Sequence, residues 1–224
     1  MPATVMGALT AHGCKPLIAE QDFTWRIYDD GCWDYFADGV TCTRLPPPAL
    51  AGAIQYRNAA VALTAWTILR APRAPEPGAL AAALRSVRLP GRLQFVPGDV
   101  EWVFDVAHNE AAAAVLAGEL RARPIAGRTI VVLGMLEDKD VAAVVGQLTP
   151  LVDHWLLCTL TGPRALTGEQ LRRRVGALRA PSELAGEVAA ATERAQRLAQ
   201  PGDRVLVCGS FYTVGPALQA RQLY

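Results

Sequence analysis

The sequence predicts an α/β protein, with a mostly parallel sheet and helices on both of its faces over the second part of the chain. From about residue 100, short apolar runs alternate with stretches whose apolar residues recur at helical spacing. Strands that alternate with helices form a parallel sheet that is covered on both faces. Hydrophobic residues make up 51% of the 224 residues and charged residues 19%, so the chain can bury such a sheet.

The segment before residue 50 is expected to be mainly β structure. Residues 5–13 resemble the last turns of a helix, because Gly13 closes the pattern. Asp29-Asp30-Gly31 is a hairpin signal between two aromatic runs, and the prolines at 46–48 end the β portion. The expected strands are residues 15–19, 25–28 and 33–36.

Two helices are expected between this β segment and the sheet. Residues 51–69 carry apolar side chains at helical spacing, and residues 80–87 form a shorter stretch of the same kind. The prolines at 72–77 predict a turn-rich break between the two helices. Leu89-Pro90-Gly91-Arg92 then ends the helical region, and the pattern of alternating strands and helices begins.

Local signals delimit the elements of the sheet region. Thr167-Gly168-Glu169-Gln170 has capping-box spacing, so we expect a helix to start there and to end near Leu178. Pro201-Gly202-Asp203 predicts the turn into the last strand. The expected strands are residues 101–105, 129–135, 154–160 and 204–208. The other expected helices are residues 110–121, residues 141–148, residues 183–199 and a last helix at the end of the chain.

Charge and hydropathy argue against two classes of partner. The 22 lysines and arginines nearly balance the 21 aspartates and glutamates, which argues against a broad nucleic-acid-binding face. Arg172-Arg173-Arg174 is the only compact basic run, and a solvated helix face explains it more simply. No stretch reads as a transmembrane helix or a signal peptide, so we expect a cytoplasmic protein with no membrane partner.

The five cysteines suggest neither a disulfide framework nor a metal site. Their number is odd, and no two of them are spaced as Cys-x-x-Cys. Cys158 and Cys208 lie inside apolar strand-like runs, so we expect them to be small core residues. The cysteine pattern therefore predicts no zinc site in this chain.

Parallel sheets bind ligands beyond the carboxyl ends of their strands, so the residues that follow the strands are the candidate site. At the first such end, Asp105 can accept hydrogen bonds from ribose hydroxyls, and His108 can donate to an anion. Asn109 can cap the next helix, whose N-terminus favours an anion. A purely structural role for Asp105 and His108 is an equal alternative. The segments concerned are residues 105–109, 134–140, 161–164 and 209–212.

At the later strand ends, structural explanations compete with functional ones. Gly134 would let a backbone approach a ligand, but the charged residues after it could form a solvated loop in which Lys139 pairs with Asp138 or Asp140. Ser210 can donate a hydrogen bond to a ligand, and an N-cap is an equally good explanation for it.

Five segments of the chain carry motifs that occur together. They are Gln55-Tyr56-Arg57-Asn58-Ala59-Ala60, Leu89-Pro90-Gly91-Arg92-Leu93-Gln94, Phe104-Asp105-Val106-Ala107-His108-Asn109, Gly134-Met135-Leu136-Glu137-Asp138-Lys139-Asp140 and Gly209-Ser210-Phe211-Tyr212-Thr213-Val214. In order and spacing they resemble the folylpolyglutamate synthase/dihydrofolate synthase family, a branch of the Mur ligase superfamily. The third motif is shared with other Mur-type ligases, whereas the last two point to the folate branch.

The resemblance implies a fold in two parts and an activity. Residues 1–88 would be the C-terminal part of the central P-loop-type ATPase domain, and residues 89–224 the Rossmann-like Mur ligase C-terminal domain, also called the glutamate ligase domain. A ligase of this family uses ATP to activate a carboxylate as an acyl phosphate, which the amino group of L-glutamate then attacks. The acceptor carboxylate belongs to a folate or to dihydropteroate. The expected cofactors are ATP and Mg²⁺.

The resemblance also assigns roles to particular residues. Asn58, Arg92 and Asp105 match positions that contact the nucleotide. An asparagine amide suits the adenine edge, and a guanidinium suits phosphate oxygens. His108 and Ser210 match positions near the glutamate or the transferring phosphate. From the residues alone, Arg92 could instead pair with a surface carboxylate, and Asn58 could bridge within its own helix.

The chain departs from the family pattern in three respects. Glu110 replaces the usual proline, and Tyr212 stands where many relatives have histidine. The sequence contains no G-x-x-x-x-G-K-[ST] phosphate loop. In the family this loop, the magnesium ligands and a modified lysine belong to the N-terminal half.

Without the phosphate loop, we expect the isolated chain to be inactive and to expose apolar surface that seeks a partner. It would then be half of a ligase, joined by a separate N-terminal half or by self-association. The alternatives are a catalytically inactive folate- or nucleotide-binding remnant and, disfavoured by the folate-branch motifs, another Mur-type ligase.

Overall fold

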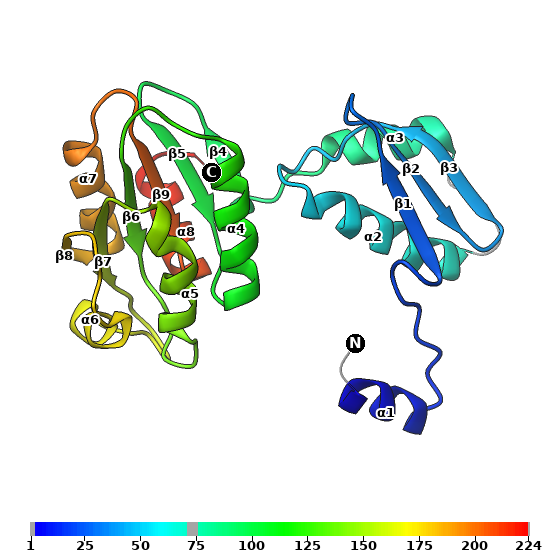
Figure 1. The fold of residues 1–224 in the computed structure, drawn as a ribbon, viewed down its shortest axis with the longest axis horizontal. Coiled ribbons are helices and arrows are strands. Elements are labelled where there is room, and N and C mark those ends of the chain that lie inside the picture. The colour runs from blue at the N-terminus through cyan, green and yellow to red at the C-terminus, as the bar shows by residue number, and fades with distance from the viewer. Residues whose placement is uncertain (1–2, 71–75, 224) are drawn as a thin grey trace. The chain divides into compact units, whose positions relative to one another are not determined.

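The computed structural model describes residues 3–70 and 76–223 and divides the chain into two compact units (Figure 1). The first unit comprises Met1–Ala49 and Ala53–Arg88, and the second comprises Leu50–Gly52 and Leu89–Tyr224. Each unit has its own sheet and its own hydrophobic core.

The first unit contains a three-stranded antiparallel sheet. The turn expected at Asp29-Asp30-Gly31 is confirmed, with Gly31 at φ +79° and its N–H donating to the Tyr28 carbonyl at 2.9 Å. Trp33 and Tyr35 are fully buried, and they share a core with Ala60 and Leu63. The elements are α1 (Ala3–Ala11), β1 (Phe23–Ile27), β2 (Trp33–Ala37), β3 (Val40–Leu45), α2 (Ile54–Arg70) and α3 (Pro77–Ser86).

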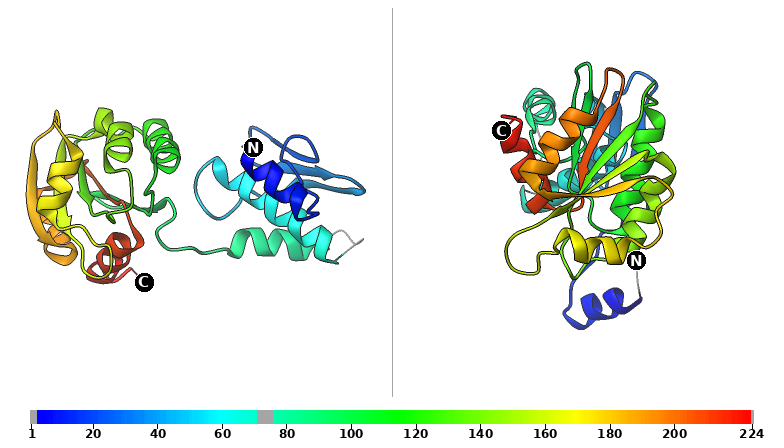
Figure 2. Two further views of the ribbon diagram at one scale, coloured as in Figure 1. Left: turned by 90° about the horizontal axis from the view of Figure 1, so that it is seen from below. Right: turned by 90° about the vertical axis from the view of Figure 1, so that its left-hand side faces the viewer.

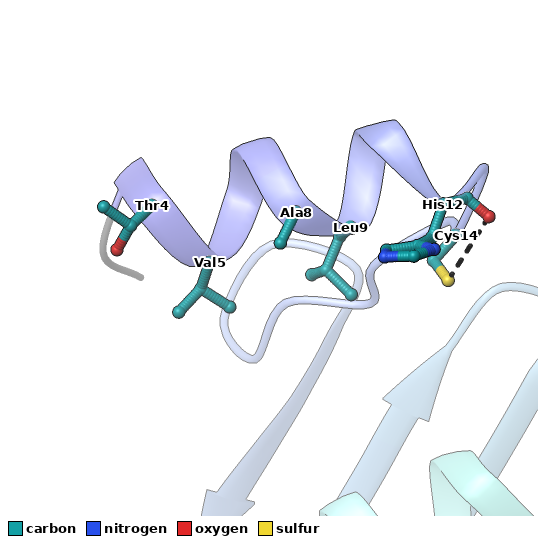
Figure 3. A pocket seen from close by; sticks show the side chains of 6 residues that line it. All are labelled: Thr4, Val5, Ala8, Leu9, His12 and Cys14. Atoms are coloured by element: carbon teal, nitrogen blue, oxygen red, sulfur yellow. Dashed lines mark hydrogen bonds between the residues drawn. The ribbon is translucent and has the colours of Figure 1, made fainter.

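Helix α1 buries none of its residues. Its side chains and those of the following turn border a pocket that opens along one side of the helix (Figure 3). The residues that line the pocket are Thr4, Val5, Ala8, Leu9, His12 and Cys14.

The second unit contains a six-stranded sheet in the order β4-β5-β9-β6-β7-β8. β4 runs antiparallel to β5, and the remaining neighbours are parallel. The strands are β4 (Gln94–Val96), β5 (Glu101–Asp105), β6 (Thr129–Leu133), β7 (His154–Thr159), β8 (Ser182–Glu187) and β9 (Arg204–Cys208). The helices are α4 (Glu110–Ala122), α5 (Val141–Leu148), the 3₁₀ helix η1 (Thr149–Leu151), α6 (Gly168–Val175), α7 (Val188–Leu198) and α8 (Phe211–Ala220).

Helices cover both faces of this sheet, as the alternating pattern predicts (Figure 2). Alternate residues of one strand face opposite ways, because successive side chains of a strand point to opposite faces. Val131 and Leu133 pack in a core with α4, α5 and α6, whereas Ile130 and Val132 pack in a core with α7 and α8. The α/β fold class with a mostly parallel sheet is therefore confirmed.

Several predicted elements are wrong in extent or in kind. Residues 15–19 form no strand, since only Ala19 makes an isolated bridge, to Phe23. The expected helix over 183–199 is a helix only from Val188, because the residues before it pair with β7 as the edge strand β8. The helix that starts after Thr167 ends at Val175, where Gly176 at φ +68° cannot continue it.

Smaller differences concern the edges of elements. β3 and β4 were not expected, and the helix expected from residue 51 begins at Ile54. Most of the break expected at 72–77 lies outside the described residues, and Pro77 opens α3. Of the helices described, none has the length and apolarity needed to cross a membrane.

Candidate functional site

The carboxyl ends of three neighbouring strands form the candidate site. β9 lies between β5 and β6, and Cys208 at its end is in register with Asp105 on one side and Leu133 on the other. The segments at these strand ends, residues 105–109, 209–212 and 134–140, therefore start side by side. The strand-end rule thus brings the predicted residues Asp105, His108 and Ser210 to one edge of the sheet.

Asp105 is 9% exposed, and both of its carboxylate oxygens accept backbone hydrogen bonds. Leu93 N–H donates to Oδ2 at 2.8 Å, and Ala107 N–H donates to Oδ1 at 2.7 Å. Burial raises the pKa of the carboxyl above its ordinary value, although these bonds and the positive charges of Arg92 and His108 oppose the shift. The carboxylate is thus tied to the chain and lies near the Arg92 guanidinium and the His108 imidazole.

Arg92 is half-buried, and its guanidinium lies over the ring of Phe211, 5.2 Å from the ring centroid. This separation is typical of a cation–π contact. Among the ion pairs of the described residues, none involves Arg92. Pairing with a surface carboxylate, the alternative suggested by the sequence, is therefore not what this part of the chain shows.

His108 is half-buried, and its Nδ1 lies 2.8 Å from the carbonyl oxygen of Val106. A carbonyl oxygen only accepts hydrogen bonds, so Nδ1 carries the hydrogen. The neutral ring then presents Nε2 as an acceptor, and the protonated ring presents it as a donor. His108 can therefore donate to a phosphate or carboxylate only in its protonated form.

Asn109 and Ser210 cap the helices that follow the two strand ends. Asn109 Oδ1 accepts from Ala112 N–H at 2.9 Å, and Ser210 Oγ accepts from Tyr212 N–H at 3.1 Å. The expected cap at Asn109 is confirmed, and the N-cap explanation of Ser210 holds as well. Ser210 is 5% exposed, and its hydroxyl retains its own hydrogen for a further partner.

The glycine at the end of β6 is required by packing. A Cβ at Gly134 would lie 2.7 Å from Leu160 Cδ2 and from Thr213 Oγ1, and the Thr213 hydroxyl donates to the Gly134 carbonyl at 2.8 Å. The close approach expected at Gly134 is thus made by neighbouring side chains of the chain itself.

The charged residues after Gly134 pair mainly with one another. Lys139 Nζ lies 2.8 Å from Asp138 Oδ2, and Arg164 from the next loop lies 3.4 Å from the same oxygen. The hydrogen bond from Lys139 lowers the pKa of Asp138. Asp140 instead caps α5 through Ala143 N–H. The pairing of Lys139 with Asp138 expected for a solvated loop is confirmed.

Asn58 belongs to the first unit, on an exposed position of α2. Its Nδ2 donates to Gln55 Oε1 at 3.1 Å, so it bridges within its own helix. Its Oδ1 and the second hydrogen of Nδ2 are still suited to an adenine edge.

The described residues bring neither a metal-binding cluster nor an exposed thiol to the candidate site. Within residues 3–70 and 76–223, no group of three or more His, Cys, Asp or Glu side chains could hold a metal ion. Cys158 and Cys208 are buried free thiols in the core, as expected.

Two residues that touch Arg92 or its loop were not singled out from the sequence. Phe211 is 56% exposed and stacks with Arg92, and Gln94 accepts a hydrogen bond from Gly91 N–H at 3.0 Å. Both lie inside quoted motifs. An aromatic residue directly after a candidate N-cap at a strand end is the sequence signal that could have identified Phe211.

Comparison with known proteins gives a consistent set of relatives. A family model described as Mur ligase, glutamate ligase domain, matches residues 91–211. The dihydrofolate synthase/folylpolyglutamate synthase of Escherichia coli (strain K12) is 36% identical over 221 residues, covering 98% of this chain and 49% of the relative. The Haemophilus influenzae protein of the same name is 31% identical, covering 96% of this chain and 52% of the relative. The chain thus spans about half the length of the curated relatives it matches.

Solved structures of the same kind match this chain. E. coli FolC in complex with DHPP and ADP has a TM-score of 0.85 at 33% identity, covering 99% of this chain and 51% of that one. A bifunctional folylpolyglutamate synthase/dihydrofolate synthase with Mn, AMPPNP and L-glutamate bound has a TM-score of 0.83 at 30% identity, covering 100% and 52%.

Proposed function

This chain belongs to the Mur ligase family, in its folylpolyglutamate synthase/dihydrofolate synthase branch, and from that premise we propose that it is part of an ATP-dependent ligase. The ligase joins L-glutamate to the carboxylate of a folate or of dihydropteroate. Residues 89–224 act as the glutamate ligase domain, and residues 1–88 as the C-terminal part of the ATPase domain.

The chemistry requires an activated carboxylate. ATP supplies a phosphoryl group that converts the acceptor carboxylate into an acyl phosphate, and ADP leaves. The amino group of L-glutamate then attacks the acyl carbon, an amide bond forms, inorganic phosphate departs and the amine loses a proton. The residues of this chain have to bind anions, orient the amine and stabilise negative charge as it develops.

The observation that carries the proposal is the meeting of two helix N-termini with Arg92 and His108 at the ends of β5 and β9. Helices α4 and α8 begin there, at the caps Asn109 and Ser210, and a helix N-terminus attracts anions. Arg92 is held over the first residue of α8, and His108 follows β5. One guanidinium, one imidazole that can donate when protonated, and two helix N-termini thus lie at one edge of the sheet, which suits phosphate and glutamate carboxylate groups.

We assign the individual roles on this basis. Arg92 contacts the nucleotide, because a planar guanidinium offers paired donors to phosphate oxygens. Asp105 contacts the nucleotide through lone pairs that its two backbone bonds leave open. His108 and Ser210 serve the glutamate or the transferring phosphate. Asn58 contacts the adenine, which rests on the family motif at residues 55–60.

The described residues contain no group of three or more His, Cys, Asp or Glu side chains that could hold a magnesium ion. A folylpolyglutamate synthase/dihydrofolate synthase relative is solved with Mn, AMPPNP and L-glutamate bound, and the family resemblance implies that the magnesium ligands lie in the N-terminal half. A polypeptide that supplies a phosphate loop is therefore a proposed partner, beside ATP, L-glutamate and the folate or dihydropteroate acceptor.

The test compares the chain alone with a chimera. The remaining half of the E. coli relative is joined to this chain, and ADP release is followed with ATP, L-glutamate and dihydropteroate. We expect the chimera to release ADP only when both substrates are present and to form a product heavier by one glutamyl residue. The chain alone is expected to show no steady ADP release.

Matched variants show whether the assigned site is responsible. Arg92→Ala should lower turnover strongly, whereas Arg172→Ala should not, because Arg172 is an exposed residue of α6 that pairs with Glu169. Steady ADP release by the chain alone would show that no partner half is needed. A chimera that folds and binds ADP but makes no product would favour a binding remnant over a ligase.

A further inference from the structure

The segment that carries Arg92 is fastened to the end of β5 by side chains as well as by backbone. The Gly91 carbonyl accepts from Val106 N–H at 3.0 Å, and Gly91 N–H donates to the side-chain Oε1 of Gln94 at 3.0 Å. Leu93 N–H donates to the side chain of Asp105 at 2.8 Å. Side chains thus accept the N–H groups on both sides of Arg92.

These side-chain acceptors take the place of the backbone hydrogen bonds between β4 and β5, which do not continue past Gln94. β4 pairs with β5 up to Gln94, opposite Phe104, and the next residue outward is Leu93. Leu93 has φ +43°, a left-handed conformation that residues other than glycine rarely adopt. At that conformation its N–H leaves the strand pattern, and a buried N–H needs another acceptor. The carboxylate of Asp105 provides that acceptor.

Packing fixes the same segment from the other sides. Leu93 is 4% exposed and belongs to the core formed with α4 and α5. Gly91 has φ +73°, and a Cβ there would lie 2.7 Å from Val214 Cγ1 on α8. Gly91 thus packs against α8 and Leu93 packs in the core. Arg92 lies between them, with its guanidinium over the ring of Phe211 at the start of α8.

We propose that Gln94 and Asp105 are positioning residues that clamp the residue 91–93 turn and thereby hold the Arg92 guanidinium over Phe211. Gln94 acts through Gly91 N–H and Asp105 through Leu93 N–H. The consequence for nucleotide binding rests on the proposed function, whereas the clamp itself does not.

Gln94 gives the cleaner test, because its role does not include a contact with the nucleotide. Gln94→Met keeps the length of the side chain and removes the acceptor, whereas Gln94→Glu keeps an oxygen that can accept from Gly91 N–H. The first readout is the Nε–H resonance of Arg92 in the full chain without ligand, measured by NMR. Phe211→Ala defines the position of that resonance without the ring.

The expected result is a shift toward the Phe211→Ala position in Gln94→Met and little shift in Gln94→Glu. An Arg92 resonance that stays at its original position in Gln94→Met would overturn the clamp. Unfolding midpoints of all variants, measured in urea, show that the comparison is made between folded proteins.

The second readout is ADP affinity in the chimera, measured by calorimetry. Gln94→Met should weaken ADP binding between about 10- and 100-fold, as is usual when a group that orients a binding contact is lost. In an Arg92→Ala background the same change should have almost no effect, since Gln94 acts through Arg92. Additive effects would overturn the positioning role. If Arg92→Ala leaves ADP affinity unchanged while the NMR result holds, the nucleotide assignment fails and the clamp remains.

Discussion

At the scale of single residues, the environment of Asp105 predicts a pH dependence. Burial raises the pKa of this carboxyl in the folded chain above its ordinary value of 3.8. A raised folded-state pKa contributes stability that is fully present below the unfolded value and is lost as pH rises through the folded value. Asp105→Asn removes that contribution. We expect the free energy of unfolding of the parent chain to fall, relative to the variant, as pH rises from below 3.8 to 7.

Urea unfolding of both proteins at a series of pH values measures this difference. The Asn side chain can accept only one of the two backbone N–H bonds, so the variant is expected to differ in stability at every pH. Only the change of that difference with pH tests the buried charge. Two pH profiles that run parallel would contradict the prediction.

The cysteines offer a second prediction at this scale. Burial raises the pKa of Cys158 to about 12, and it also raises that of Cys208, with the nearby Asp105 charge adding to the effect. The thiolate is the reactive form, so these thiols should resist alkylation at pH 8. Cys14 is exposed and should react quickly. Mass spectrometry after iodoacetamide treatment, with and without urea, distinguishes the sites, and modification of Cys208 in the native chain would contradict the expectation.

At the scale of elements, the junction of β6 and β9 depends on two facing glycines. Gly209 has φ +106°, and a Cβ there would lie 2.9 Å from Met135 Cγ and would press on the Gly134 carbonyl oxygen. Gly209→Ala should therefore cost at least about 2 kcal/mol of stability through strain and overpacking. A Cβ added at Gly118 on α4 would meet open space, so Gly118→Ala should stabilise the chain by roughly 0.5–1 kcal/mol.

Chemical denaturation measures both changes on the same unit, which makes Gly118→Ala a matched control for the glycine replacement itself. Equal effects of the two substitutions on the free energy of unfolding would mean that the junction is not tightly packed. A loss confined to Gly209→Ala supports the packing argument.

Sequence patterns predicted the inner strands and failed at the edges of the sheet. The inner strands β6 and β9 are mostly apolar, and this composition predicts that both of their faces are buried. Ser182–Glu187 is polar and rich in helix formers, and it becomes strand β8 only because β7 offers a partner. Propensity cannot reveal a pairing of that kind, since tertiary contacts override it.

The candidate site was likewise predictable only in part: sequence patterns indicated the positions of several residues but not their roles or supporting contacts. Asp105 ends a strand, and His108 and Ser210 follow strands, so the strand-end rule placed all three, although it did not assign their roles. The role of Gln94 depends on the antiparallel pairing of the three-residue strand β4, which no periodicity shows. The left-handed Leu93 that makes the clamp necessary is likewise invisible in a sequence.

At the scale of the whole molecule, helix α1 is the element whose stability is least explained by the described chain. It has 9 residues and buries none of them, and isolated helices shorter than about 12–15 residues are marginal in water. We expect its backbone amides to exchange with deuterium almost as fast as those of an unfolded peptide. The amides of α4, which buries Leu116 and Leu120, should be protected far longer and serve as the internal control.

The same measurement in the presence of the complementary half of the E. coli relative tests whether a partner covers α1. Val5, Ala8 and Leu9 line its open side, and burial of these side chains would add the packing that a short helix needs (Figure 3). Protection of the α1 amides should therefore rise when the partner is added, and Leu9→Gln should reduce that rise without changing the protection of α4. Slow exchange of α1 in the chain alone would show that the helix is stable by itself and needs no partner.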